Sequence, residues 1–260
     1  RALIALLALL VAGAGFSLLH PEPPAAELHM SGRTMGTTYN VKYRSTQDAP
    51  SLKAMQLEVD TLLAEVNHTM STYDPESELS RFNRLRTTDW VPASASLRAV
   101  LKAALEVGAQ SEGAFDITVG PLVNLWGFGP DVHPDRVPRE TDIAAARMRS
   151  GLDKITLSET QPAIRKHRPD VFLDLSGIAK GYGVDRVAEL MTAHGIKHFM
   201  VEIGGEIRVR GLKEQDTPWR IAIEKPLSGE RSVHTMLALS DIALATSGNY
   251  RNFFEVAGRR

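Results

Sequence analysis

Apolar residues recur at helical spacing in two long stretches of the chain. The first stretch runs from Ser51 to about Met70 and carries one apolar stripe, made of Leu52, Met55, Val59, Leu62, Leu63 and Val66. The second stretch runs from about Ser94 to Ser111, with a stripe made of Leu97, Val100, Leu101, Ala104, Leu105 and Val107. Steps of three and four residues predict amphipathic helices. Both stripes are therefore assigned to the hydrophobic core.

Alternating apolar and polar residues predict strands elsewhere. Tyr39–Tyr43 has this pattern, and two short runs, 155–157 and 163–165, are spaced to form a hairpin. Four further runs crowd into the last third of the chain: 198–203, 206–210, 219–223 and 234–239. Gly204 and Gly205 stand between the first two of these and predict a tight hairpin turn. Adjacent strands with long helices elsewhere indicate an α+β fold with a largely antiparallel sheet.

One stretch, Val171–Asp185, combines apolar residues with residues suited to chemistry. We expect a short strand at 171–173, with Asp174 at its end, Ser176 as the N-cap and a helix to about His194. Gly177 allows a ligand to approach the backbone closely. Lys180 falls in the first helical turn, where a cation gains nothing from the helix dipole and an anion would explain it. Two interpretations stay open: a strand-to-helix turn that binds phosphate and a metal ion, or an ordinary turn whose lysine is only solvated.

Three segments between these elements are less regular. Pro75 disfavours helix at Asp74, which leaves Tyr73 in a loop, either to stack on a planar ring or to pack; a short helix or turn follows at 77–83. Residues 114–130 are dense in glycine and aromatic side chains, which fits either a wall against a ligand or an irregular core loop. Thr141 is expected to cap a short helix through Met148.

Composition narrows the class of protein. The chain has 260 residues, a formal net charge of −1 and no cysteine. A net charge this close to zero gives no indication of a nucleic-acid-binding surface. Without cysteine the chain can form no disulfides, thiolate zinc sites or cysteine nucleophiles. Residues 1–27 begin with Arg1 and an apolar run to about Leu19, followed by a proline-containing linker. This pattern predicts a secretory signal or membrane anchor ahead of a folded domain from 28 to 260.

Several common catalytic motifs do not occur. The chain has no H-E-x-x-H, and Asp174 stands where a G-x-S-x-G elbow needs glycine. Lys180 precedes a glycine, whereas a Walker A loop has G-K-[ST]. These absences leave the 171–185 stretch without a generic motif of its own.

Several segments of the chain match the motifs of one known family: Met35–Thr37, Met70–Tyr73, Ser77–Asn83, Gly113–Asp116, Gly120–Val123, Leu125–Gly129, Asp174–Tyr182, Ile203–Glu206 and Ser247–Arg251. With these segments, which follow the family's order from about Met30 to the last residue, the chain resembles the ApbE family, the periplasmic FAD:protein FMN transferases. The resemblance implies an ApbE-like, T-fold-like architecture. It also implies an enzyme that cleaves FAD at its pyrophosphate, joins FMN to a threonine or serine hydroxyl of an acceptor protein, and releases AMP.

The resemblance also assigns roles to residues. FAD would be bound by Met35, Tyr73, Ala114, Phe115, Asp116, Asp174 and Lys180, and Gly177 would offer a backbone carbonyl to Mg²⁺, a hard cation that takes oxygen ligands. The expected partners are flavinylated subunits of redox-driven ion pumps, and the expected location is the periplasm, with association to the inner membrane.

The sequence of this chain departs from the family's pattern at two places. The family continues into a motif H-x-I-D-P-x-T-G and then into an aspartate and a threonine that bind the metal. These lie beyond Arg260, so this chain is expected to be truncated at its C-terminus and to hold no catalytic residue of its own. Gly183 stands where alanine is common. Two alternative functions stay open: an FAD-binding protein without transfer activity, and a pyrophosphatase that splits FAD into FMN and AMP.

Overall fold

The computed structural model describes residues 27–130, 137–226, 232–248 and 253. The predicted signal or anchor segment and its linker lie outside these residues, except for Glu27. Within the described part, no helix is long and apolar enough to cross a membrane.

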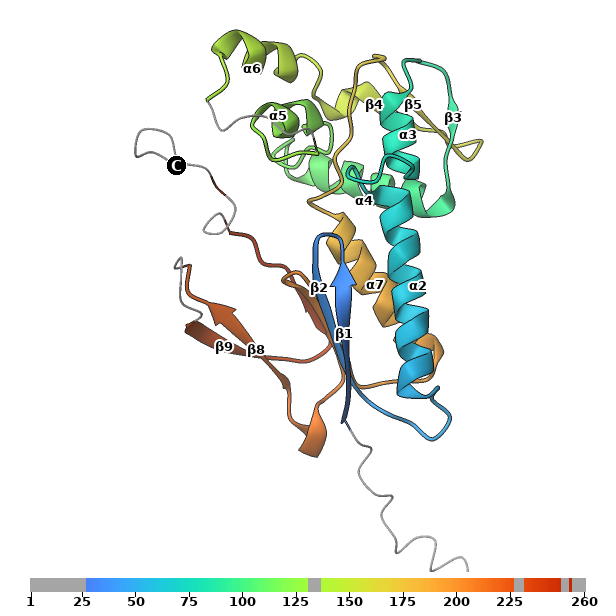
Figure 1. Cartoon of the computed structure of the whole chain (residues 1–260), viewed down its shortest axis with the longest axis vertical. Coiled ribbons are helices and arrows are strands. Elements are labelled where there is room, and N and C mark those ends of the chain that lie inside the picture. The colour runs from blue at the N-terminus through green and yellow to red at the C-terminus, as the bar shows by residue number, and fades with distance from the viewer. Residues whose placement is uncertain (1–26, 131–136, 227–231, 249–252, 254–260) are drawn as a thin grey trace, which may run out of the picture.

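A five-stranded antiparallel sheet forms one half of the molecule (Figure 1). Its order is β1-β2-β6-β7-β10, with bounds Glu27–Thr34, Thr37–Arg44, Phe199–Ile203, Glu206–Arg210 and Ile242–Leu244. Helices α2 (Leu52–Met70) and α7 (Ala179–Ala193) cover it on one side. The alternating residues Tyr39, Val41 and Tyr43 point into the core beneath these helices and are at most 1% exposed.

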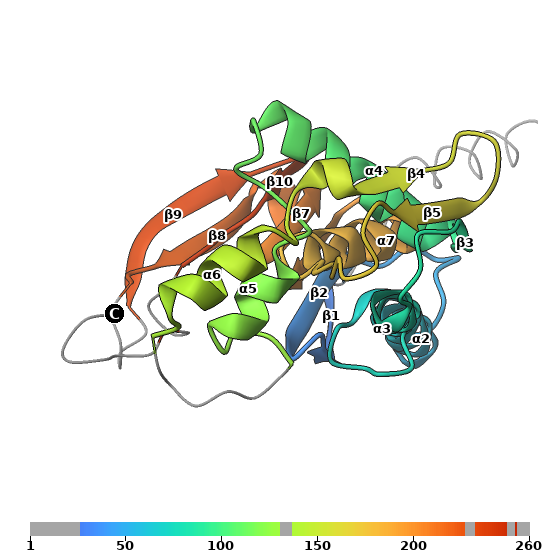
Figure 2. The same ribbon diagram turned by 90° about the horizontal axis from the view of Figure 1, so that it is seen from above.

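The other half gathers further helices and a small sheet at one end of α2 (Figures 1 and 2). These are α3 (Glu78–Arg84), α4 (Ala95–Gln110), α5 (Gly120–Leu125), α6 (Glu140–Arg147) and a three-stranded sheet in the order β3-β5-β4, with bounds Val91–Pro92, Ala163–Lys166 and Ile155–Leu157. Short 3₁₀ turns lie at Leu152–Lys154 and Glu214–Asp216. A separate hairpin, β8 (Trp219–Glu224) with β9 (Val233–Leu239), lies apart from this half.

Each of the two halves has its own hydrophobic cluster. One joins the large sheet to α2 and α7, and the other fills the space between α3, α4 and the small sheet. Met35 and Leu62 pack against both clusters. The two halves are thus held together along α2 and at the start of α7.

Most sequence-based elements are confirmed, and the α+β class with antiparallel sheets is correct. Both long helices are present, and each begins after a serine whose side chain accepts a backbone hydrogen bond: Ser51 from Ala54 and Ser94 from Leu97. The 155–157 and 163–165 runs pair as β4 and β5, and Gly204–Gly205 turns β6 into β7. The 77–83 segment is the helix α3, capped by Ser77.

Four predictions about elements were wrong or incomplete. Residues 171–175 are extended but form no strand, because side chains rather than a neighbouring strand satisfy part of their backbone. Helix α7 begins after Ile178, so Ser176 is not its N-cap. Helix α6 begins after Arg139, so Thr141 lies inside it. Strands β1 and β10 were not predicted, since β1 interrupts its apolar residues with polar ones and β10 is very short.

Candidate functional site

The site is built around the segment that leads from 171 into α7. Val171, Leu173 and Leu175 are each at most 1% exposed, which fixes this extended backbone in the core and turns the intervening residues outward. The backbone N–H of Asp174 donates to the carbonyl oxygen of Ile117 at 2.8 Å. The Asp174 carboxylate accepts a hydrogen bond from the N–H of Ser176 at 2.7 Å, which closes a tight turn before the helix. Asp174 is thereby held at a fixed place.

Tyr73 comes to the same place from the loop between α2 and α3. Its ring is 66% exposed, and its hydroxyl donates to the carbonyl oxygen of Phe128 at 3.1 Å. Partial burial raises the pKa of the Tyr73 phenol, and the negative charge of Asp174 raises it further. Tyr73 and Asp174, 101 positions apart by their numbers, are therefore electrostatic neighbours.

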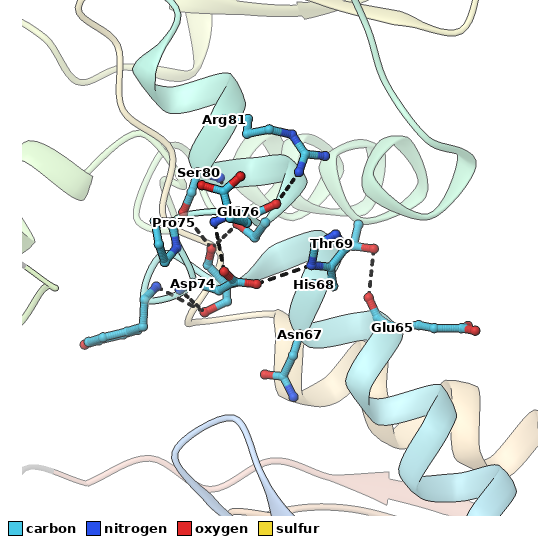
Figure 3. Close-up of polar contacts among 12 residues, drawn as sticks. Glu65, Asn67, His68, Thr69, Asp74, Pro75, Glu76, Ser80 and Arg81 are labelled. Carbon is cyan, nitrogen blue, oxygen red and sulfur yellow. Dashed lines mark hydrogen bonds and ion pairs between the residues drawn. The ribbon is translucent and has the colours of Figure 1, made fainter.

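Polar contacts make the loop that carries Tyr73 rigid. The Ser71 hydroxyl accepts from the N–H groups of Tyr73 and Asp74, each at 3.1 Å. The Asp74 carboxylate accepts from the N–H of Glu76 at 2.8 Å and lies 3.3 Å from the His68 ring (Figure 3). An exposed aromatic ring on a rigid loop is well prepared to stack on a flat ligand, because little further ordering is needed on binding.

A third segment of the site is the loop 111–118, which packs against Gly177. Phe115 lies against Gly177 so closely that a methyl group added at Gly177 would be 3.1 Å from Cε2 of the Phe115 ring. Asp116 turns its carboxylate back into its own loop, where it accepts from the N–H and hydroxyl of Thr118 at 2.7 and 2.6 Å. Ala114 is exposed on the same loop. Phe115, Gly177, Asp174 and Tyr73 thus form one connected group.

Lys180 lies in the first turn of α7, and Met35 packs against the next turn at Gly183. The Lys180 ammonium lies 3.0 and 2.9 Å from the two carboxylate oxygens of Glu206 and 3.4 Å from the Gly204 carbonyl oxygen. Its predicted anion is therefore present within the protein as Glu206. The assignment of Lys180 to FAD stays a prediction, as do the other ligand roles.

Met35 occupies the β1–β2 turn with a positive φ of 48°, a conformation that costs a non-glycine residue about 1 kcal/mol. Its Cε would lie 2.9 Å from a methyl group added at Gly183 of α7. Gly183 is thus packed closely against a predicted FAD residue. Two hairpin turns, 35–36 and 204–205, meet the first turns of α7 in this way.

Metal ligands are scarce in the described residues. No group of three or more His, Asp or Glu side chains gathers there. The Asp174 carboxylate and the backbone of the 176–178 turn offer oxygen atoms of the kind that Mg²⁺ prefers. A groove of about 670 Å³ lies between α7 and β7–β10, lined by residues such as Asp185, Arg208 and Ile242, and it contains none of the predicted site residues.

Three contacts that shape the site were not predicted from the sequence. Glu206 neutralises Lys180, the Phe128 carbonyl holds Tyr73, and Asn83 binds the backbone just before Asp174. All three residues lie in the segments that resemble the ApbE family. Their presence in those segments was the one sign in the sequence that these residues belong to the site. Their contact partners could not be predicted, because no sequence spacing links residues so far apart in the chain.

Comparison with known proteins agrees with this geometry. The ApbE family profile matches residues 35–260. A Vibrio cholerae protein named FAD:protein FMN transferase is 48% identical over 239 residues, covering 92% of this chain and 71% of the relative. The Escherichia coli K12 protein of the same name is 35% identical over 261 residues, covering 97% and 74%.

Solved structures give the same result. The flavin transferase ApbE from Vibrio cholerae superimposes with a TM-score of 0.82 at 47% identity, over 90% of this chain and 75% of that one. The apbe protein from Thermotoga maritima, at 27% identity, has a TM-score of 0.80 over 90% and 74%. The expected ApbE-like fold is thereby confirmed. With its family segments assembled around the start of α7, this chain belongs to the ApbE family.

Proposed function

We propose that this protein transfers FMN from FAD to a threonine or serine hydroxyl of an acceptor protein and releases AMP. The observation that carries the proposal is the 48% identity, over 92% of the chain, to a protein named FAD:protein FMN transferase. It is supported by the meeting of Tyr73, Phe115, Asp174 and Gly177 at one place, since these residues come from three separate family segments.

The residues of the chain would bind and orient FAD. The exposed Tyr73 ring offers a flat apolar face for the isoalloxazine or the adenine. Met35, Ala114, Phe115 and Asp116 would line the same ligand. Asp174, held by the Ile117 carbonyl and the 176–178 turn, would accept hydrogen bonds from a ligand hydroxyl or amide. Lys180, balanced by Glu206, would donate a hydrogen bond without adding a net positive charge.

Mg²⁺ is part of the proposal. Among the described residues, the Gly177 carbonyl, with Asp174 nearby, would supply oxygen ligands, and diphosphate oxygens and water would contribute to the shell, as is usual for Mg²⁺ beside phosphates. When bound, the ion neutralises charge on the diphosphate.

In the transfer step the acceptor oxygen forms a bond to the phosphorus of the FMN half, and the bond from that phosphorus to the AMP oxygen breaks. The hydroxyl proton is released and AMP leaves with the bridging oxygen. Catalysis of this kind depends mainly on positioning and charge stabilisation. Rigid placement of Tyr73 and Asp174 by their hydrogen bonds is the contribution of the described residues.

We further propose a periplasmic location, with acceptors among flavinylated subunits of redox-driven ion pumps at the inner membrane. The support is the apolar run up to Leu19, with small residues at 12–15, ahead of a proline-containing linker. Fractionation of cells that make the tagged protein tests this location, and recovery in the cytoplasm would contradict it.

The transfer is tested by incubating the protein with FAD, Mg²⁺ and an acceptor domain, with the Vibrio cholerae relative as a reference. Flavin that stays on the acceptor after denaturation supports transfer. Free FMN with an unmodified acceptor would mean pyrophosphatase activity, and intact FAD would mean binding alone. A chelator added to a parallel reaction tests the need for Mg²⁺.

A further inference from the structure

The backbone just before Asp174 is held by a single side chain. Asn83 donates from Nδ2 to the carbonyl oxygen of Leu173 at 2.8 Å, and its Oδ1 accepts from the N–H of Leu173 at 2.8 Å. Asn83 is only 6% exposed, and Leu173 is fully buried. One amide group therefore satisfies both backbone polar groups of one buried residue, as a neighbouring strand would do.

Asn83 is itself fixed in place. It lies in the last turn of α3, where backbone carbonyl groups lack helical partners. The ammonium of Lys166, 1% exposed on β5, donates to the carbonyl oxygens of Asn83 and Leu85 at 3.0 Å each. The end of α3 is thereby joined to β5, and the Asn83 side chain has little freedom to move.

This contact sets which residues of the segment face the ligand. Side chains of an extended backbone alternate between its two faces, so a slip by one residue would turn Asp174 into the core and Leu173 outward. With no strand beside residues 171–175, hydrogen bonds at Leu173 and Asp174 define the register. The bond from Asp174 to Ile117 forms only in that register.

We propose that Asn83 is a positioning residue for the flavin site: its side-chain amide fixes the register of residues 171–175 and thereby the place of Asp174 and the 176–178 turn. The proposal rests on the proposed function, because the ligand placed by Asp174 is taken to be FAD. Asn83 itself does not touch the ligand, and it acts through the Leu173 backbone.

The first test compares FAD affinity in two variants with a similar loss of buried polar contacts. Asn83→Ala is expected to bind FAD about tenfold more weakly than the unchanged protein, equivalent to roughly 1.4 kcal/mol. Ser158→Ala is the matched control, since Ser158 is 7% exposed and also bonds two backbone N–H groups, in the β4–β5 turn away from the site. Its FAD affinity should be unchanged. Equal affinity in Asn83→Ala, or an equal loss in Ser158→Ala, would overturn the proposal.

A second variant, Asn83→Asp, keeps the shape of the side chain and carries the test if Asn83→Ala does not fold. Its ionised carboxylate would still accept from Leu173 N–H but would repel the Leu173 carbonyl, whereas the protonated form would donate to it. The buried ammonium of Lys166 contacts the same residue and favours the ionised form, so the repulsion is present at neutral pH. Asn83→Asp should therefore bind FAD more weakly than the unchanged protein at pH 7. Equal affinity of the two proteins would contradict the proposal.

A double variant tests the route through Asp174. If Asn83 acts through Asp174, adding Asn83→Ala to Asp174→Ala should lower FAD affinity much less than it does alone. Full multiplication of the two losses would refute this route. Amide hydrogen exchange at Leu173, measured without FAD, should quicken in Asn83→Ala, which removes the acceptor of the Leu173 N–H, whether or not the protein binds FAD. Failure of FAD binding in the unchanged protein would thus reject the proposed function, and unchanged exchange would reject the positioning role.

Discussion

Replacing Lys166 with methionine removes a buried ammonium group while keeping a chain of similar length. Lys166 is 1% exposed, and burial, with a smaller contribution from the positive charge of Arg86, lowers the pKa of its ammonium from 10.5 to about 8. The folded protein therefore holds this proton less tightly than the unfolded chain does. Between these two pKa values the unfolded chain binds more protons, so the free energy of unfolding should rise with pH.

The size of the effect follows from the two pKa values. Relative to neutral pH, deprotonation of Lys166 should add about 1 kcal/mol to the free energy of unfolding at pH 9 and about 2–3 kcal/mol at pH 10. Lys166→Met has no such group, and it leaves two carbonyl oxygens without a donor, at roughly 1–3 kcal/mol each. At pH 7 these losses partly cancel against removal of the buried charge.

Urea unfolding of both proteins at pH 7, 8, 9 and 10 measures this difference. Tyrosines and other groups titrate in both proteins, so their effects cancel in the comparison. The stability of the unchanged protein minus that of Lys166→Met should rise steadily above pH 8. A difference that stays flat to pH 10 would mean that Lys166 keeps an ordinary pKa. Burial of its charged ammonium at the end of α3 would then not lower the free energy of unfolding.

Three further predictions concern helix ends, glycines and Lys180. Ser77→Ala removes the N-cap of α3 and the hydroxyl that donates to Ser71 at 2.5 Å, so urea unfolding should show a loss of about 1–2 kcal/mol; an unchanged midpoint would contradict the capping role. The Cβ added by Gly181→Ala has no atom within 4 Å and lies in a helix, so this variant should be more stable by up to about 1 kcal/mol. Gly204 has a φ of +54°, and a Cβ added there would lie 2.7 Å from the Thr37 methyl, so Gly204→Ala should lower the melting temperature. Stability changes of the opposite sign would contradict this packing. Lys180→Ala should weaken FAD binding in titrations with little change in melting temperature, because the Lys180–Glu206 pair is partly exposed; unchanged FAD affinity would make the lysine structural.

The predicted elements of the fold are those with strong local patterns. The stripes of α2 and α4 and the alternation in β2 and β6–β9 repeat over several turns or pleats, so periodicity alone identified them. The segment 171–173 has the apolar composition of a strand, but its partner is the Asn83 side chain, and no local pattern encodes such a contact. The start of α7 was misplaced because Ser176 is a favourable cap that instead takes part in the turn closed by Asp174.

The site was predicted in part for the same reason. Asp174, Gly177 and Lys180 were singled out because they share one short stretch with a strand-like run and a helix start. The contacts of Tyr73 with Phe128 and of Lys180 with Glu206 join distant segments, and only the folded chain brings them together. The resemblance to the ApbE family identified these segments without showing how they meet.

Equilibrium titration with FAD, NAD and ATP tests most directly the claim that the start of α7 is a flavin site. The protein should prefer FAD by at least about tenfold. Tyr73→Ala should abolish this preference, while Trp90→Ala, which removes another exposed aromatic ring beside Arg165, should preserve it. Equal affinity for the three nucleotides, or an FAD preference that survives in Tyr73→Ala, would contradict the account.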